Sequence, residues 1–176
     1  LATLVGPDGD AHTFEPSPAD SIAVAEADLV IENGFAFETW MDDFYAASGS
    51  RAKRAQATAA VAPLVIPTGG QPGELDPHVW LDAQNAMRMV ETIRDALSQL
   101  DPDNAAAYAA NAERYLAELQ TLDDWIVAQV ETLPPERRKL VTSHDTLGYF
   151  ARRYGFELVG DAFGSVSTES ADPSAA

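Results

Sequence analysis

Residues 103–133 contain neither glycine nor proline, the two residue types that most readily interrupt a helix. Asp101 and Pro102 precede this stretch as a capping residue and a proline at the first helical position, and Pro134 ends it. A helix of this length would extend about 45 Å at 1.5 Å per residue. The apolar stripe of this helix is compatible with packing on a core or with one half of a helical hairpin. The length of the helix favours a third arrangement, in which it joins two lobes. The stripe consists of Tyr108, Ala112, Tyr115, Leu119, Leu122, Ile126, Val130 and Leu133.

The first part of the chain alternates between short apolar runs and helical patterns. Leu1–Val5 and Ala27–Ile31 are expected to be strands. Ser17 is expected to cap a helix that has Pro18 at its first position, and a second helix is expected from about Phe37 to Ala47. This β-α-β-α order favours a parallel sheet covered by helices.

Residues 49–76 show little regular pattern. One apolar run, Val61–Ile66, fits a strand, and a connection rich in Gly and Pro follows it. Asp82 is then expected to cap a helix that continues to about Leu100.

A second β-α-β unit is expected after Pro134. Residues 138–142 and 156–159 have strand character, and a short helix over 147–154 separates them, with Gly155 as its left-handed C-cap. Two strands and one short helix do not make a stable lobe alone, so the second lobe is expected to be incomplete in this chain.

The predicted fold class is therefore α/β, with two parallel-sheet α/β lobes joined by a long helix. The expected boundaries are 1–101 for an N-terminal lobe lacking its start, 102–134 for the linker helix, and 135–176 for the beginning of a C-terminal lobe.

Composition limits the classes of function. A net charge of −17 argues against binding to nucleic acid or to an anionic membrane, both of which need basic patches. The chain has no cysteine, which excludes disulfides and thiolate metal sites. A metal site must then use His, Asp, Glu or water, and with several imidazoles it would suit Zn, Mn, Ni or Fe better than Ca or Mg.

The three histidines each occur in a short polar motif at the edge of an expected element. His12 follows the first expected strand, His78 precedes a helix, and His144 follows a strand of the second unit. Ligands of open α/β sheets bind beyond the carboxyl ends of strands, so the three imidazoles are expected to converge in a cleft between lobes. Each motif alone is more typical of a structural or exposed histidine than of a metal ligand.

Each motif also contains a carboxylate that can accept a hydrogen bond from the ring nitrogen not bound to metal. Such a partner fixes the tautomer of a ligating histidine. The candidates are Asp10, Asp76, Asp82 and Asp145. An alternative function is a zinc-dependent hydrolase with Asp145 or Asp82 as its general base, although no known catalytic motif supports it.

Taken together and in this order, the motifs resemble the metal-specific solute-binding proteins of bacterial ABC importers, the zinc and manganese class. The resemblance spans nearly the whole chain. It rests on Gly6–His12 with Glu15–Pro18, Ala27–Ile31 with Asn33-Gly34, Asp76–Asp82, the long helix, Thr142–Asp145 with Gly148–Phe150, Tyr154-Gly155, Ser167–Glu169, and Pro173-Ser174.

The resemblance implies two lobes joined by a rigid helix, with His12 and His78 as metal ligands from the first lobe and His144 from the second. Manganese-type members usually have Glu where this chain has His144, so zinc is expected first and manganese second. A fourth ligand would lie outside this chain.

The resemblance also implies a monomeric, non-enzymatic protein that works with a membrane ABC permease. Its expected location is periplasmic or otherwise extracytoplasmic, either soluble or membrane-anchored, with the signal segment outside this chain. Some members of the class are described as adhesins, which leaves a surface adhesin with the same fold as a further alternative.

Overall fold

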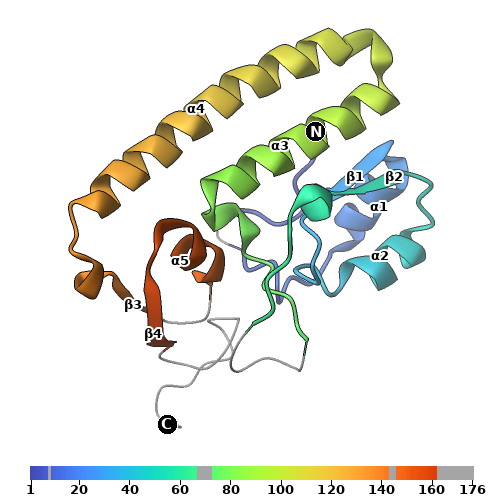
Figure 1. The fold of residues 1–176 in the computed structure, drawn as a ribbon. Coiled ribbons are helices and arrows are strands. Elements are labelled where there is room, and N and C mark those ends of the chain that lie inside the picture. Colours follow the sequence, from blue (N-terminus) through green and yellow to red (C-terminus); the bar gives the residue numbers. More distant parts are fainter. Residues whose placement is uncertain (8, 67–72, 143–145, 162–176) are drawn as a thin grey trace, which may run out of the picture.

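The computed structural model describes residues 1–7, 9–66, 73–142 and 146–161 (Figure 1). Two parallel β-α-β units lie beneath a pair of long helices in the view of Figure 1. The α-helices are α1 (Pro18–Glu26), α2 (Met41–Ser48), α3 (Ala83–Leu100), α4 (Ala105–Glu131) and α5 (Gly148–Tyr154). The strands are β1 (Leu29–Glu32), β2 (Lys53–Gln56), β3 (Lys139–Thr142) and β4 (Glu157–Asp161). Short 3-10 turns occur at Ala57–Ala60, Val79–Leu81, Pro102–Asn104 and Pro135–Arg137.

The first unit is built on the parallel pair β1–β2, with α2 as the crossover helix. Leu29 pairs with Lys53 and Glu32 with Gln56. A small apolar core packs α1 and α2 against β1, which is the expected arrangement for a helix-covered parallel sheet. Its buried members are Val24, Val30, Met41 and Ala52, with Leu4, Ala27, Trp40, Phe44 and Tyr45 packed around them.

The start of α1 confirms the expected cap. The Ser17 hydroxyl accepts a hydrogen bond from the Asp20 backbone N–H, and the Asp20 carboxylate accepts one from the Ser17 backbone N–H at 2.8 Å. This reciprocal pair satisfies two of the N–H groups that a helix start leaves without partners. Pro18 occupies the first helical position, as predicted.

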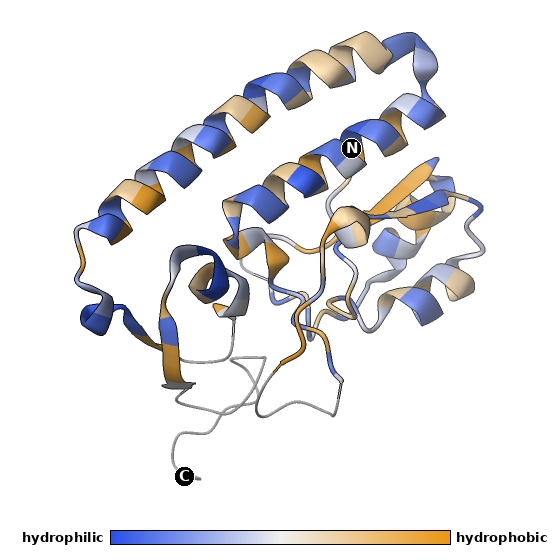
Figure 2. Cartoon of the chain, in the orientation of Figure 1, coloured by the Kyte–Doolittle hydropathy of each residue, from blue (hydrophilic) through white to orange (hydrophobic). Residues whose placement is uncertain are grey.

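Three sequence expectations in this unit are wrong. Leu1–Val5 is not a strand, and Leu1 is exposed. The apolar run Val61–Ile66 contributes only a single antiparallel bridge, between Val65 and Leu75. Strand β2 was not expected, because its sequence Lys-Arg-Ala-Gln is polar where β1 is apolar (Figure 2). Only pairing with β1 identifies it as a strand.

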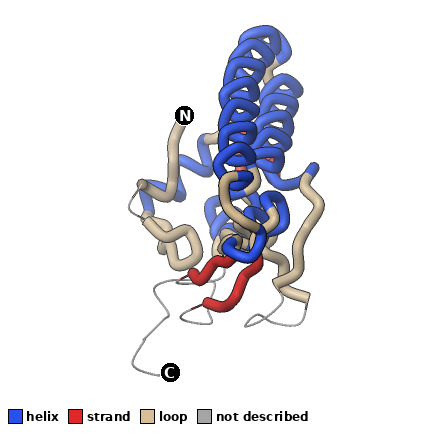
Figure 3. The backbone as a smooth tube through the Cα atoms, turned by 60° about the vertical axis from the view of Figure 1, so that its left-hand side comes forward, coloured by secondary structure: helices blue, strands red, loops and turns tan. Residues whose placement is uncertain are grey.

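Helices α3 and α4 form an antiparallel hairpin that turns at Pro102–Asn104 (Figures 1 and 3). The long helix is therefore both a connection to the second unit and one half of a hairpin. Its buried positions are Ala112, Leu119, Asp123 and Val130, whereas Tyr115 and Leu122 are about half exposed, at 51% and 46%. The predicted stripe is wrong at Tyr115 and Leu122, because spacings of three and four fit two adjacent rows of the helix equally well. It is also wrong at Leu133, which is exposed and lies beyond the end of α4.

The second unit is the parallel pair β3–β4, with α5 as its crossover. Gly155 ends α5 in the left-handed conformation, at φ 75°, as predicted. Tyr149 of α5 is fully buried against Val61 and Val79, and its hydroxyl oxygen accepts a hydrogen bond from the Leu64 backbone N–H at 2.9 Å. This helix therefore packs into the loops of the first unit.

A cluster of polar side chains (Asp82, Asp123, Arg153 and Tyr154) joins α5 to both long helices. Asp123 of α4, only 2% exposed, accepts a hydrogen bond from Arg153 Nη2 at 2.5 Å and one from the Tyr154 hydroxyl at 2.8 Å. Burial and the hydrogen bond to Asp123 raise the pKa of Tyr154 well above its usual range, so the hydroxyl stays a donor. Arg153 Nε also lies 3.8 Å from a carboxylate oxygen of Asp82, the residue that caps α3.

These observations confirm the predicted fold class: two parallel-sheet α/β units connected by a long helix.

The hydrogen bonds that Asp123 accepts lead to a prediction about stability. Asp123→Ala should lower the free energy of unfolding by about 2–3 kcal/mol, because it leaves the Arg153 and Tyr154 donors without their buried acceptor. Asp124→Ala, one residue further along α4, removes an exposed carboxylate and should change stability by less than about 0.5 kcal/mol. Urea unfolding followed by circular dichroism measures both, and equal effects would contradict the assignment.

Candidate metal centre

His12 is held by the loop that precedes α1. Its backbone N–H donates a hydrogen bond to Asp10 Oδ1 at 2.8 Å, which fixes a local turn. The indole Nε1–H of Trp40 donates to the carbonyl oxygen of Ala11 at 2.8 Å, and the Trp40 ring packs against Phe14. The loop is thus attached to the residue that precedes α2, and the half-buried His12 ring has a defined position.

His78 is held more tightly, by a single carboxylate. Asp76 Oδ1 lies 2.8 Å from His78 Nδ1 and also accepts the His78 backbone N–H at 2.9 Å. Both residues are buried, at 3% exposure for His78 and 4% for Asp76. An Nδ1–H donated to this carboxylate leaves Nε2 with its lone pair available, which is the arrangement seen in ligating histidines.

The two imidazoles meet through these Nε2 atoms. His12 Nε2 and His78 Nε2 are 3.4 Å apart, although the residues are separated by 66 positions in the chain. Two nitrogens bound to one tetrahedral zinc at the usual bond length would be about 3.3–3.4 Å apart. The pair therefore has the spacing of two ligands of one metal ion.

The loop after β1 supports this pair and was not identified from the sequence. Asn33 Nδ2 donates a hydrogen bond at 3.0 Å to the carbonyl oxygen of Pro77, the residue before His78. Phe37 places its ring 4.6 Å from the His12 ring, centroid to centroid, in an edge-on arrangement. The Asn33-Gly34 dipeptide signals a turn, but nothing in it shows what the turn contacts.

The second unit approaches the same site through Gly148, the first residue of α5. A side chain there would place its Cβ 2.7 Å from Asp76 Oδ2, so only glycine fits without a shift. The backbone of α5 therefore lies directly against the carboxylate that orients His78.

The other predicted site residues either bind backbone N–H groups or lie outside the part of the chain that the structure describes. His144 and Asp145 lie outside the described residues. Asp10 binds the backbone of His12, and Asp82 accepts the Gln84 backbone N–H at 2.9 Å as the cap of α3. Among the residues that the structure describes, no cluster of three or more His, Cys, Asp or Glu side chains suits a metal ion, so the pair His12–His78 is what this part of the chain supplies.

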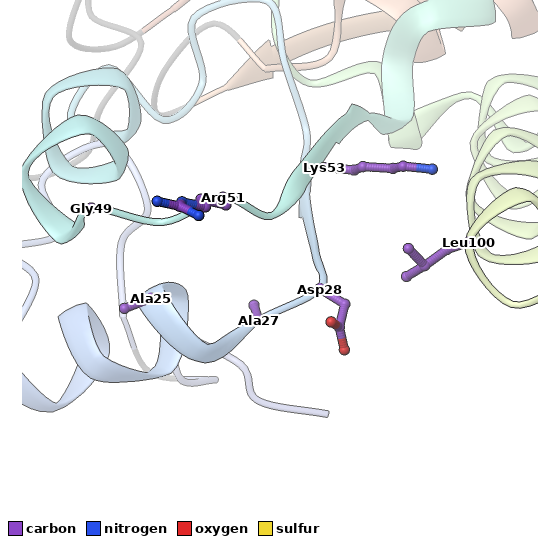
Figure 4. A pocket seen from close by; sticks show the side chains of 7 residues that line it. All are labelled: Ala25, Ala27, Asp28, Gly49, Arg51, Lys53 and Leu100. Atoms are coloured by element: carbon purple, nitrogen blue, oxygen red, sulfur yellow. The ribbon is translucent and has the colours of Figure 1, made fainter.

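A separate pocket lies among the C-terminal ends of α1, α2 and α3 and the starts of β1 and β2 (Figure 4). Its two cationic side chains diverge, with Arg51 directed toward Gly49 and Lys53 toward Leu100, so they do not converge on one ligand. The other lining residues are Ala25, Ala27 and Asp28.

Comparison with known proteins identifies the family. All of residues 1–176 match the family model described as ZnuA, zinc-uptake complex component A, periplasmic. The chain belongs to this family. The resemblance inferred from the histidine motifs is thereby confirmed, and the family is one of solute-binding proteins of ABC metal transporters.

Individual relatives are named for different metals. The manganese-binding lipoprotein MntA of Halalkalibacterium halodurans is 42% identical over 160 residues, which cover 90% of this chain and 52% of that protein. The iron-binding protein YfeA of Yersinia pestis is 34% identical over 159 residues, covering 90% of this chain and 51% of that protein. The chain spans about half the length of the curated relatives that it matches.

Solved structures agree with this assignment. The crystal structure of a zinc-bound ZnuA deletion mutant superposes with a TM-score of 0.81 at 33% identity. The matched region covers 89% of this chain and 59% of the chain in that crystal structure.

None of the helices in the described part of the chain combines the length and apolar character needed to cross a bilayer.

The hydrogen bond between Asp76 and His78 can be tested directly. Asp76→Asn should weaken zinc binding by about 10–100-fold, because the orienting partner of a ligating histidine loses its charge. Asp82→Ala, which removes the side-chain cap of α3, should lower thermal stability more than zinc affinity. Calorimetric titration with zinc, beside thermal melting, separates the two effects. Equal loss of affinity in both variants would show that Asp76 acts through folding alone.

Proposed function

We propose that this chain captures a divalent transition metal, zinc first and manganese second, for delivery to a membrane ABC permease. The observation that carries the proposal is the His12–His78 pair, with its two Nε2 atoms 3.4 Å apart and Asp76 fixing one ring. Two preoriented imidazoles lose little entropy when a metal binds, which is what high affinity requires.

His144 is proposed as the third ligand, since it follows β3 directly in the sequence and α5 brings the second unit against Asp76. Asp145 is proposed as its partner, in the way that Asp76 serves His78. A donor set rich in imidazole favours zinc over manganese. The chain is similar both to a relative named for manganese and to a structure that contains zinc. The affinities for the two metals must therefore be compared experimentally.

The mechanism proposed for capture is displacement of water. The net charge of −17 raises the local concentration of cations, and the imidazoles then replace waters of the hydrated ion. The fourth ligand is proposed to be water or a carboxylate. Loading would fix the second unit against the first, and the loaded monomer would then dock on the permease outside the cytoplasm.

The domain division proposed for this mechanism places the N-terminal lobe at 1–101, the linker helix at 102–134 and the C-terminal lobe from 135. The turn at Pro102–Asn104 between α3 and α4 supports the first boundary, and the turn at Pro135–Arg137 before β3 supports the second.

Substitution of the histidines is the decisive test. His12→Ala, His78→Ala and His144→Ala should each weaken zinc binding by more than about 100-fold, because losing even the partner of a ligand typically costs about 10–100-fold. Asp28→Ala, an exposed carboxylate at the separate pocket, is the control and should leave affinity unchanged. Calorimetry with circular dichroism measures binding and fold together. A tight site that survives all three substitutions would refute the proposal.

The proposed site also predicts a pH dependence. Imidazole binds metal only when it is neutral, and the ordinary pKa of histidine is about 6.5. Protons therefore compete with zinc as the pH falls, and affinity should drop by more than about tenfold between pH 7.5 and pH 5. Zinc titrations at the two pH values measure this, and equal affinities would exclude a site made of histidines.

A further inference from the structure

Phe37 is the ring that connects the aromatic groups around the proposed metal site. Its centroid lies 4.6 Å from that of His12, 6.1 Å from that of His78 and 5.1 Å from that of Trp80, each in an edge-on arrangement. Trp80 packs edge-on against His78 as well, at 5.5 Å. Phe37 therefore packs against both imidazoles and against Trp80.

The backbone that presents Phe37 is strained. Phe35 and Ala36, the two residues before it, have φ values of 53° and 57°. Residues other than glycine rarely adopt this left-handed region, and such strain persists only where the surroundings enforce it. A relaxed chain would extend α2 toward Phe37, where the sequence pattern predicts a helix start, but α2 begins at Met41.

Side-chain hydrogen bonds hold the two residues that precede this strained pair. The Glu38 carboxylate accepts the backbone N–H groups of Asn33 at 2.7 Å and Gly34 at 3.3 Å. Thr58 donates its hydroxyl to the Asn33 carbonyl oxygen at 2.7 Å, and its Oγ1 would be 2.5 Å from any Cβ at Gly34. Glu38 and Thr58 thus hold the start of the loop that leads to the Phe37 ring.

A rigid apolar ring beside two ligands restricts the space around a bound ion. Zinc is satisfied by four ligands in a tetrahedron. Manganese suits oxygen donors in a six-coordinate arrangement, which here would require additional waters next to the imidazoles. An aromatic ring provides no hydrogen-bond partner for such waters, and a stable water needs two to four polar partners.

We propose that Phe37 is a specificity-determining residue: its ring, held by the strained 34–36 loop, excludes water from one side of the His12–His78 pair and so favours zinc over manganese. This inference rests on the proposed function, because it assumes that the histidine pair binds the ion.

The test compares two metals in the intact protein. Phe37→Ala should lower the ratio of manganese to zinc dissociation constants by about tenfold, since it opens space for water without removing a ligand. Phe37→Leu retains apolar bulk and should largely restore the wild-type ratio. Phe156→Ala, the same truncation at a ring that packs on Phe150 in the second unit, is the matched control and should leave the ratio unchanged.

Cobalt supplies a second readout. Tetrahedral cobalt(II) absorbs visible light much more strongly than six-coordinate cobalt(II), so the loaded wild-type protein should be intensely coloured and Phe37→Ala much paler. A purely structural role for Phe37 would weaken all metals equally and leave the cobalt spectrum unchanged, which would overturn the inference. An unchanged metal ratio in Phe37→Ala would also overturn it.

The same titrations distinguish failure of this inference from failure of the proposed function. Suppose that wild type binds zinc tightly, that His12→Ala abolishes this binding, and that Phe37→Ala leaves the ratio of manganese to zinc dissociation constants unaltered. This result would refute only the role of Phe37. No tight binding by wild type, or binding indifferent to His12, would overturn both.

Discussion

The carboxylate of Asp76 is the point on which the arrangement of this protein depends. Through one oxygen it accepts both the backbone N–H and the ring Nδ1 of His78, and its other oxygen lies where any side chain at Gly148 would have to be. The orientation of a proposed ligand and the closest approach of the second unit are therefore set by one buried group. A buried carboxylate is costly unless it is hydrogen-bonded, so loss of the two His78 hydrogen bonds would be unfavourable.

Helix α5 extends this connection along its length. Tyr149 fills the apolar space between Val61 and Val79, and Arg153 and Tyr154 bind Asp123 at the other end of the helix. This seven-residue helix thus contacts both the loops of the first unit and the long helix α4. Displacement of α5 would disturb the His78 loop and the helical hairpin at once, which couples the position of the second unit to the geometry of the site.

Local signals predicted most elements correctly, and tertiary contacts account for those that were missed. The Ser17 cap, the Asp82 cap and Gly155 follow from side-chain chemistry that acts within a few residues. Strand β2 has a polar sequence and exists because β1 pairs with it. The convergence of His12 and His78 could be expected from their places at the edges of elements. Phe37 could not, because its position depends on a strained turn that Glu38 and Thr58 stabilise from outside.

The α3–α4 hairpin has a consequence for how the molecule folds. Its contacts join residues close to a single tight turn, whereas β1–β2 and β3–β4 are parallel pairs that require a crossover before they can form. Contacts of short sequence separation form fastest, so the hairpin should assemble early. Each β-α-β unit could then complete its sheet against a helix already in place. The proposed metal site needs loops from chain segments that precede and follow the hairpin, so it would be among the last features to form.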